Sequence, residues 1–549
     1  MNIDINKIGY RWKGIYSPYL SYSENDVVYK AGGAYVIRNG VPVEFALGQQ
    51  DAILKGHLLT GGVSVGGFAN TVLHSNGAGG VEFRFQDTKG GTLATGLMDT
   101  RTGRHGNYLT YAYNMQSIMS DGSVRTWGNQ LNGCGGAGSH GDIGRTFPGR
   151  VAFPPGTPPI TYVCGFWTDA FYLDASGTVW HSGANYQNIG GRGGQDNIPG
   201  KINGLGDMPA DAKIVKIRGA SDYYDYRTIM FLDDQGRVYM TGNNSYNNHG
   251  MTGSSPYPRL VPFTVNTPIK EMFTSGGNYT ATALISTEGQ LWVCGQGGST
   301  GYGVDIAKHA LWMPWGIDKP VKQVTYTESD AHWVAGSQYF RNFGVVLENG
   351  DLYVWGDVGG QYACGWGVGY NSDIWTGSAL HPYKVLTDVQ EYGSSSGGYP
   401  TLVALMKDGT VKVTGDSNYS VNPSATQTWQ TVGGSLLTNC TRLTFQSGQY
   451  AKTAGVLRSD GKVVIWGQDN TGMAGVGTAP GGRVPTDFVM LEQPIVDFQF
   501  SGWYNPTQTQ STAHFLTADG QVYSSGSATY NVNGDDDGEN TYVPRQILF

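Results

Sequence analysis

The side chains that could support catalysis are scattered along this 549-residue chain. The zinc-protease pattern HExxH, the Walker phosphate loop and clustered Cys and His zinc ligands are all missing from the sequence. Gly133, Gly135 and Gly138 satisfy GxGxxG, but no strand-helix-strand context surrounds them, and a dinucleotide site requires that context. The sequence therefore predicts that the protein is not an enzyme, and that it uses no cofactor and no metal.

Histidines and carboxylates provide weaker candidates for chemistry. The ten histidines are dispersed along the chain, so a structural role is expected for each, including His181, His249, His332 and His514. Residues 535–539, from Asp535 to Glu539, gather four carboxylates that suit calcium, but their spacing is not that of an EF-hand, and a solvated turn is the alternative. Paired carboxylates for glycoside hydrolysis can come from distant segments, which leaves a polysaccharide-degrading enzyme open as a second alternative function.

Aromatic residues beside amides and carboxylates are the stronger binding feature. Flat rings next to Asn, Asp and Gln suit sugars, which offer apolar C–H patches together with hydroxyl groups. The alternative is that such rings pack between structural units or against another subunit. The candidate ligand-binding residues are Tyr223, Tyr224, Tyr226, Trp366, Trp375, Trp503 and Tyr504.

These candidates lie between copies of a pattern that occurs eight times. In each copy an aliphatic residue stands four positions before a turn glycine, another stands two positions after it, and a second glycine follows six positions after it. The turn glycines are Gly122, Gly177, Gly236, Gly289, Gly350, Gly409, Gly461 and Gly520, and successive copies are 52 to 61 residues apart. A period of this length predicts a propeller, solenoid or array.

The residues around each turn glycine select among these folds. Asn349 and Gly350 separate two runs of β-branched and aromatic residues, which is a strong hairpin signal because glycine tolerates the positive φ of such turns. One hairpin per period cannot bury its own apolar face, so the units must pack around a common centre. We therefore predict an all-β protein with a closed ring of small sheets.

The repeats resemble those of the regulator of chromosome condensation family, which form β-propellers. The unit from Trp466 to Gly477 follows that family's Trp-Gly and glycine-rich loop, and Trp127 begins a second good copy. The copies at Gly242, Gly415 and Gly526 lack the tryptophan. The resemblance covers roughly residues 105–549 and implies a β-propeller. Family members usually have seven blades, so we predict a single propeller of seven to eight blades, with eight preferred.

The two ends of the repeat region suggest how the ring closes. The last unit ends in a proline-containing stretch, residues 543–549, which elsewhere leads into the strands of the next blade. Residues 109–113 precede the first hairpin and can supply the missing strand. The first and last units are therefore predicted to share a blade, which leaves no open sheet edge.

The N-terminal residues differ in composition from the repeats. Residues 1–50 resemble a small three-stranded β module of bacterial chitin-binding domains and of bacteriophage tail and fibre proteins, through Trp12, Tyr22 and Tyr29 among others. Residues 51–104 are a glycine-rich stretch similar to linkers in phage tail fibres. The predicted domains are an attachment module at 1–50, a linker or neck at 51–104 and the propeller at 105–549. An ordinary core and connector is the alternative for the first two.

Composition limits the partners. The formal net charge is −8, with 35 basic and 43 acidic residues and no run of Lys or Arg, so nucleic-acid binding is not expected. The five cysteines lack paired spacing and are expected to be free and buried. No apolar stretch approaches the length of a secretory signal or a membrane-spanning helix.

Together these features predict a structural bacteriophage virion protein, a fibre, tail or head appendage made in the host cytoplasm and located in the virion. Its N-terminal region would bind other virion proteins, its propeller would bind a host-surface polysaccharide or another virion protein, and a homotrimer is the suggested assembly. The alternative is a cellular propeller scaffold that binds a protein partner.

Overall fold

In the computed structural model, the regular secondary structure of the described residues is almost entirely β-strand. It describes residues 93–549 except 100–113, 130–132, 139–144, 167, 186–188, 191–195, 221–226, 245–248, 252, 275–280, 296–316, 318–319, 331–338, 357–378, 395–400, 416–425, 447–452, 478–480, 506–507, 530–531 and 535–538, together with seven strands in the first 92 residues. The described helical elements are two short 3₁₀ turns, η5 (Pro262–Val265) and η8 (Gly434–Leu437).

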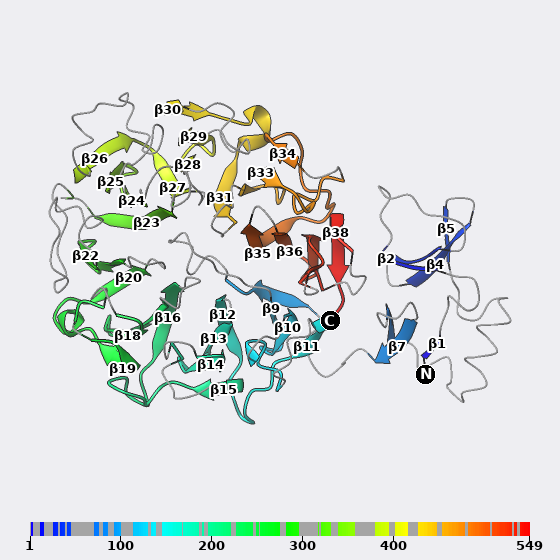
Figure 1. The fold of residues 1–549 in the computed structure, drawn as a ribbon, viewed down its shortest axis with the longest axis horizontal. Coiled ribbons are helices and arrows are strands. Elements are labelled where there is room, and N and C mark those ends of the chain that lie inside the picture. Colours follow the sequence, from blue (N-terminus) through cyan, green and yellow to red (C-terminus); the bar gives the residue numbers. More distant parts are fainter. Residues whose placement is uncertain are drawn as a thin grey trace.

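Eight consecutive antiparallel sheets form the blades of a propeller (Figure 1). The inner strand of each blade comes first in the sequence and the outer strand comes last, as β12 and β15 show in Figure 1. Blade 1 contains β8 (Ala94–Leu97), β9 (Asn114–Met119), β10 (Val124–Gly128) and β11 (Arg145–Arg150), and blade 2 contains β12 (Ile160–Phe166), β13 (Asp169–Asp174), β14 (Val179–Gly183) and β15 (Asp196–Lys201). Blade 3 contains β16 (Ile214–Ala220), β17 (Thr228–Asp233), β18 (Val238–Gly242) and β19 (Ser255–Leu260). The described strands of blade 4 are β20 (Ile269–Thr274), β21 (Ala281–Ser286) and β22 (Leu291–Gly295).

The second half of the ring repeats the arrangement with four strands in every blade. Blade 5 contains β23 (Val321–Asp330), β24 (Tyr339–Leu347), β25 (Leu352–Gly356) and β26 (Ala379–Leu386), and blade 6 contains β27 (Val389–Ser394), β28 (Thr401–Met406), β29 (Val411–Gly415) and β30 (Thr426–Thr431). Blade 7 contains β31 (Cys440–Phe445), β32 (Thr453–Arg458), β33 (Val463–Asp469) and β34 (Gly481–Arg483). Blade 8 contains β35 (Ile495–Asn505), β36 (Gln508–Thr517), β37 (Val522–Gly526) and β38 (Thr541–Ile547). The predicted all-β propeller is confirmed, and it has eight blades.

The N-terminal strands form two further sheets. One contains β2 (Arg11–Ile15), β3 (Asp26–Lys30), β4 (Gly33–Arg38) and β5 (Val41–Glu44), and the other β1 (Asn2–Ile3), β6 (Thr71–Ser75) and β7 (Val81–Phe85). The first of these sheets has four strands where three were expected. Because β1 pairs with β7, the segments 1–50 and 51–104 share a sheet. Because β8 belongs to blade 1, the ring begins before residue 105.

The turn glycines are needed for two reasons. All eight have positive φ, between 76° and 93°, which L residues with a side chain rarely adopt. In addition, a Cβ on Gly122 would lie 2.3 Å from Cβ of Pro159, and one on Gly461 would lie 2.7 Å from Cβ of Pro494. Both prolines directly precede the inner strand of the next blade. The repeated glycine therefore makes the hairpin turn and also allows the next blade to approach.

The same glycines link every blade to the next. The carbonyl of each accepts a hydrogen bond from the first amide of the following inner strand, at 2.7 to 3.0 Å. The pairs are Gly122 with Ile160, Gly177 with Ile214, Gly236 with Ile269, Gly289 with Val321, Gly350 with Val389, Gly409 with Cys440, Gly461 with Ile495, and Gly520 with Ala94. We call the last pair's contact, between blades 8 and 1, the closing junction, and the other seven the internal junctions.

The closing junction corrects the predicted closure. Residues 109–113 lie outside the described residues, and the inner strand of blade 1 is β8, from the segment predicted to be a linker. Blade 8 takes its four strands from residues 495–547 and blade 1 takes its four from residues 94–150. The expectation that the first and last units share a blade is therefore wrong. The ring closes through contacts between two complete blades, near the C-terminus (Figure 1).

Side-chain packing makes the closing junction part of one continuous core. A single apolar cluster combines Ala94, Leu97 and Trp127 of blade 1 with Leu516 and Val522 of blade 8. The indole Nε1–H of Trp127 donates to the carbonyl of Val532 at 3.0 Å, and its ring lies against His514 and Phe549. Trp127 is fully buried, so apolar burial holds the two ends of the ring together.

Candidate functional site

The predicted ligand-binding residues fall into two groups. Trp503 and Tyr504 lie on β35, where they pair with Gln510 and Thr509 of β36. They therefore belong to a hairpin rather than to an inter-blade loop. The other five lie outside the described residues: Tyr223, Tyr224, Tyr226, Trp366 and Trp375.

Two hairpins are longer than the others and extend past their own blades. In blade 8, β36 pairs with β37 only as far as Thr512, whereas its pairing with β35 continues to Gln508. In blade 5, β24 pairs with β25 only as far as Asn342, whereas its pairing with β23 continues to Tyr339. The extensions lie at the end of the blade opposite the turn glycines. They place Trp503 and Tyr504 beyond the four-stranded part of blade 8.

The glycine-rich loop after β10 is structural. A Cβ on Gly133 would lie 2.6 Å from Cα of Asn197, and the amide of Gly138 donates to the carbonyl of Asn197 at 2.8 Å. Asn197 belongs to β15, the outer strand of the next blade. The loop therefore packs blade 1 against blade 2, and its glycines are not available to a dinucleotide.

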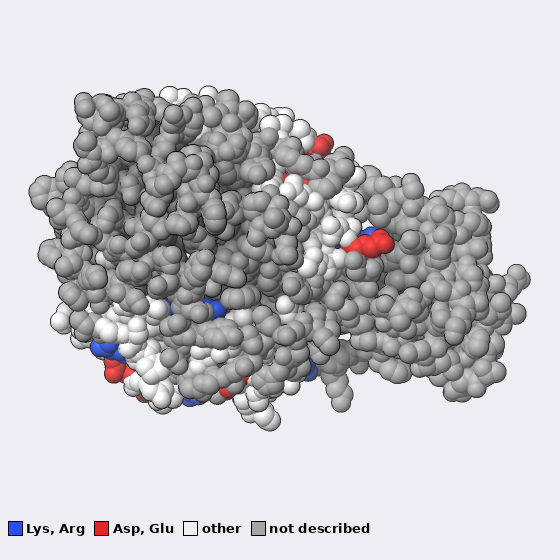
Figure 2. Space-filling view, in the orientation of Figure 1, with Lys and Arg blue, Asp and Glu red and all other residues white. Residues whose placement is uncertain are grey.

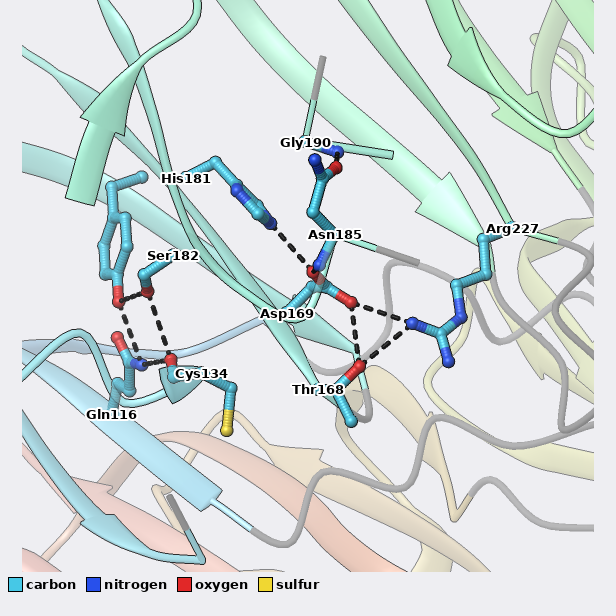
Figure 3. A network of polar contacts seen from close by, with 10 residues as sticks. Gln116, Cys134, Thr168, Asp169, His181, Ser182, Asn185, Gly190 and Arg227 are labelled. Atoms are coloured by element: carbon cyan, nitrogen blue, oxygen red, sulfur yellow. Dashed lines mark hydrogen bonds and ion pairs between the residues drawn. The ribbon is translucent and has the colours of Figure 1, made fainter. Parts of the chain in front are cut away.

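A network of fully buried polar groups lies between blades 2 and 3 (Figure 3). Asp169 Oδ1 is 2.8 Å from His181 Nε2, and Asp169 Oδ2 accepts a hydrogen bond from Arg227 Nη1 at 2.9 Å. Thr168 Oγ1 is 2.9 Å from both Asp169 Oδ2 and Arg227 Nη1, and the amide of Asn185 donates to Asp169 Oδ1. The side chains of Asp169, His181 and Arg227 have no exposed surface.

Electrostatics explains why this carboxylate is charged inside the protein. Burial acts to raise the pKa of Asp169, but the hydrogen bond and charge of His181, the charge of Arg227 and the amide of Asn185 together lower it below its usual value. Asp169 and Arg227 thus form a buried ion pair between two blades. An Asp–His pair resembles part of a catalytic triad, but without solvent access it joins blades rather than acting on a substrate.

A second buried network lies between blades 1 and 2 (Figure 3). The Gln116 amide donates to the Cys134 carbonyl and to the Tyr172 hydroxyl, which is 3.1 Å from Ser182 Oγ. Burial raises the pKa of both Tyr172 and the Cys134 thiol, so both stay protonated. The described cysteines are free and buried, as expected: Cys134, Cys164, Cys294 and Cys440.

Two further histidines, His249 and His514, are buried, and burial keeps both neutral. Burial lowers the pKa of His249, with a further contribution from the charge of Arg259, to about 3. Burial alone lowers the pKa of His514 to about 3, and its Nε2 is 2.7 Å from Ser501 Oγ. His332 and residues 535–538 of the acidic loop lie outside the described residues. The described part of the chain contains no group of His, Cys, Asp and Glu that could hold a metal.

A belt of polar side chains joins neighbouring inner strands. Each of these side chains stands at the third residue of its strand and reaches the inner strand of the next blade. Lys216 Nζ contacts Glu271, Gln323 accepts a hydrogen bond from the amide of Tyr392, and Arg442 pairs with Asp497.

Blade 1 has Gly96 at the corresponding position, and residues of β8 line a cavity of about 540 Å³. Its lining includes Thr95, Gly96, Asp99, Tyr162, Asp497 and Gln499. A Cβ on Gly96 would make only ordinary contacts, at 3.5 Å or more, with Ile118, so neither backbone conformation nor crowding requires glycine here. This small residue leaves the polar belt interrupted at the closing junction.

Sequence reasoning did not find these networks. Asp169 and Arg227 are 58 residues apart and on different blades, and neither belongs to the repeated pattern. Gly96 lies before the first copy of that pattern, where no register exists to compare it with the other blades. A blade-by-blade alignment that began at residue 93 would have indicated Gly96 as the exception.

On one face of the molecule, the charged side chains of the described residues do not gather into a single patch. On the face shown in Figure 2, Lys and Arg, and Asp and Glu, lie in small separate groups. No helix among the described residues is long and apolar enough to cross a membrane.

A scan against protein-family models and a search of curated proteins each found no match. A search of solved structures found several with low sequence identity. Human WBSCR16 has a TM-score of 0.48 and 18% identity, covering 69% of this chain and 97% of its own. Yeast RCC1 (Prp20), solved in complex with Kap60, has a TM-score of 0.47 and 16% identity, covering 84% and 90%. Prp20p from Saccharomyces cerevisiae, reported with its binding to Gsp1p and histones, has a TM-score of 0.46 and 15% identity, covering 77% and 85%.

These findings contradict the prediction of a bacteriophage virion protein, because the matched propellers named above are human and yeast proteins. The N-terminal resemblance to tail fibres and the virion partners predicted from it are not supported, and the predicted location in the virion is untested. Polysaccharide binding and a homotrimer stay untested predictions. The resemblance to the regulator of chromosome condensation repeat is confirmed as a resemblance of fold, and the strand pairing makes this chain an eight-bladed β-propeller.

Proposed function

We propose that the protein is a non-enzymatic propeller scaffold that binds a protein partner through the two extended hairpins, β23–β24 and β35–β36. The observation that carries the proposal is the pairing of β35 with β36 beyond Thr512, where β37 has ended. A two-stranded extension on a closed ring presents backbone groups beyond the four-stranded part of the blade, where a partner can reach them. The hairpin of blade 5 repeats the feature.

The buried polar groups support a scaffold rather than an enzyme. Asp169, His181 and Arg227 are inaccessible and bonded to one another across two blades. His514 is buried against Trp127, and the Cys134 thiol stays protonated. These described groups with the chemistry to act as base or nucleophile therefore have structural roles. Gsp1p, histones and Kap60 are partners of other proteins and are not assigned to this chain.

Affinity capture with the full-length protein, followed by cross-linking and mass spectrometry, tests the proposal. The variant Trp503→Ser/Tyr504→Ser changes two residues of the blade 8 extension. The matched control, Lys407→Ala/Asp408→Asn, changes two exposed residues at the hairpin turn between β28 and β29 of blade 6. This turn lies at the blade end that carries the turn glycines, opposite the end that carries the extensions. We expect a protein that cross-links to residues 502–511 of the wild type to be lost from the hairpin variant and retained by the control. Equal capture by all three proteins would contradict the proposed binding site.

A further inference from the structure

Seven residues at the entry to the ring contact three blades. The amide of Ala94 donates to the carbonyl of Gly520 in blade 8 at 2.7 Å, and β8 pairs with β9 within blade 1. The amide of Asp99 then donates to the carbonyl of Val163 in blade 2 at 2.7 Å, and its carboxylate accepts a hydrogen bond from Tyr162. We call residues 93–99 the clasp because they join the last blade to the first two.

The clasp has less support than the corresponding segments elsewhere. At an internal junction the two blades are also joined by the chain itself, which runs from the outer strand of one blade into the inner strand of the next. At the closing junction the joined residues Gly520 and Ala94 are far apart in sequence, so no such link limits their separation. The backbone hydrogen bond is the same in both cases, but only at the closing junction does no strand-to-strand connection limit how far the two blades separate once it breaks.

Local packing around the clasp is also weaker. β8 has four residues, whereas the inner strands of the other blades have six to eleven. It borders the cavity of about 540 Å³, and Gly96 contributes no side chain to fill it. A short strand beside a cavity loses few contacts when it detaches, and such segments open at low free energy.

We propose that the clasp is a releasable closure, and that its displacement opens the ring between blades 8 and 1 while the other seven junctions stay intact. The chain enters the ring through the clasp, so a ligand or force acting on the N-terminal strands acts directly on it. Opening would expose the apolar cluster shared by Leu97, Leu516 and Val522. The proposal does not depend on partner binding by the hairpins.

Hydrogen exchange of the full-length protein under native conditions tests the proposal. We expect amides of residues 93–99 and 515–522 to exchange together and about tenfold faster than those of the internal junction formed by Gly409 and Cys440. Exchange at the closing junction that is no faster than at the internal junction would overturn the proposal.

Matched variants keep the test decisive. Ala94→Pro removes the amide that bonds Gly520, and Cys440→Pro removes the amide that bonds Gly409; both residues begin a strand, where proline is tolerated. Ala94→Pro should raise exchange on both sides of the closing junction, and Cys440→Pro should leave that junction unchanged. Gly96→Ala has room for its methyl group and should slow exchange of the clasp about threefold by restricting the detached chain. If Ala94→Pro does not fold, the wild-type comparison and Gly96→Ala still decide, and unchanged exchange in Gly96→Ala would count against the proposal.

Discussion

The junction between blades 2 and 3 and the closing junction use the same backbone bond, and both bury apolar side chains, but only the first adds a buried ion pair. In the first, Gly177 accepts from Ile214 and the buried Asp169–Arg227 ion pair bridges the blades. In the second, Gly520 accepts from Ala94, and Trp127 of blade 1 inserts against blade 8. The repeat thus specifies the backbone contact between blades and leaves the side chains of each junction free to differ.

The difference follows from chain connectivity. A buried ion pair requires both charges to be desolvated and is costly when its geometry is disturbed. Blades 2 and 3 are held in register by the intervening chain, which keeps Asp169 and Arg227 aligned. The closing junction has no such constraint, and apolar packing tolerates small displacements because it has no directional requirement.

The largest expected effect comes from removing the apolar anchor of the closing junction. Trp127→Ala should lower the free energy of unfolding by about 5 kcal/mol, the upper end for a buried aromatic, because a hydrogen bond to Val532 is lost as well. Urea unfolding measures the loss, and small-angle scattering should show an expanded ring. Trp466 is the matched control: it is also fully buried and precedes the second glycine of its blade, but packs between blades 6 and 7. Trp466→Ala should destabilise without expansion, and equal expansion in both variants would erase the distinction between junctions.

Removing one charge tests the junction between blades 2 and 3. Arg227→Ala should cost about 3 kcal/mol, because it leaves Asp169 buried beside fewer compensating groups. Urea unfolding of the double variant Asp169→Asn/Arg227→Met should show at least half of the loss restored, since no uncompensated charge is then buried. If the double variant is less stable than Arg227→Ala, the ion pair does not have the role assigned to it.

A turn glycine at the closing junction should have an intermediate effect. In Gly520→Ala the methyl group would lie 2.9 Å from Cβ of Leu93 at a φ of 80°, and we expect a loss of about 2 kcal/mol. Gly156 is the control: its φ is 83° but no atom lies within 4 Å of the Cβ position. Thermal unfolding of Gly156→Ala should show about half that loss. Equal losses would mean that φ alone, and not contact between blades, requires the glycine.

The smallest expected effect is the contribution of His514 to acid sensitivity. Its pKa is about 3 in the folded protein, below the ordinary value of 6.5. The unfolded chain therefore binds a proton as pH falls below 6.5 while the folded protein does not, so stability present above pH 6.5 is lost as pH falls toward 3.

By pH 5.5 this single group should cost about 1.4 kcal/mol. Urea midpoints at pH 7 and pH 5.5 should therefore differ less in His514→Asn than in the wild type. His249→Asn should reduce the difference similarly, because the pKa of His249 is also about 3. His249 lies away from the closing junction, so small-angle scattering of His249→Asn should show no change in ring size. An unaltered pH dependence in His514→Asn would exclude the assigned role.

Local sequence signals were sufficient for the blades but not for their connections. Asn349 and Gly350, like the other seven turns, specify a hairpin through backbone conformation alone, and the eight-fold repetition predicted the ring. The prediction that the first and last units share a blade was wrong because β8 has no repeat signal that distinguishes it from a linker. Five of the seven aromatic candidates lie outside the described residues. Trp503 and Tyr504 were expected in a loop but lie on strand β35, because the turn pattern does not encode the length of the inner strand.

The sequence by itself determined that this protein is an all-β ring of eight similar units, because the positive φ of a glycine turn and the alternation of apolar residues act within a few positions of the chain. Only the tertiary structure decided that Ala94 meets Gly520, that Asp169 meets Arg227, and that Gly96 leaves a cavity beside the clasp. Those contacts join residues on different strands or blades. They form only when the whole ring has assembled, so no local pattern of residue types can specify them.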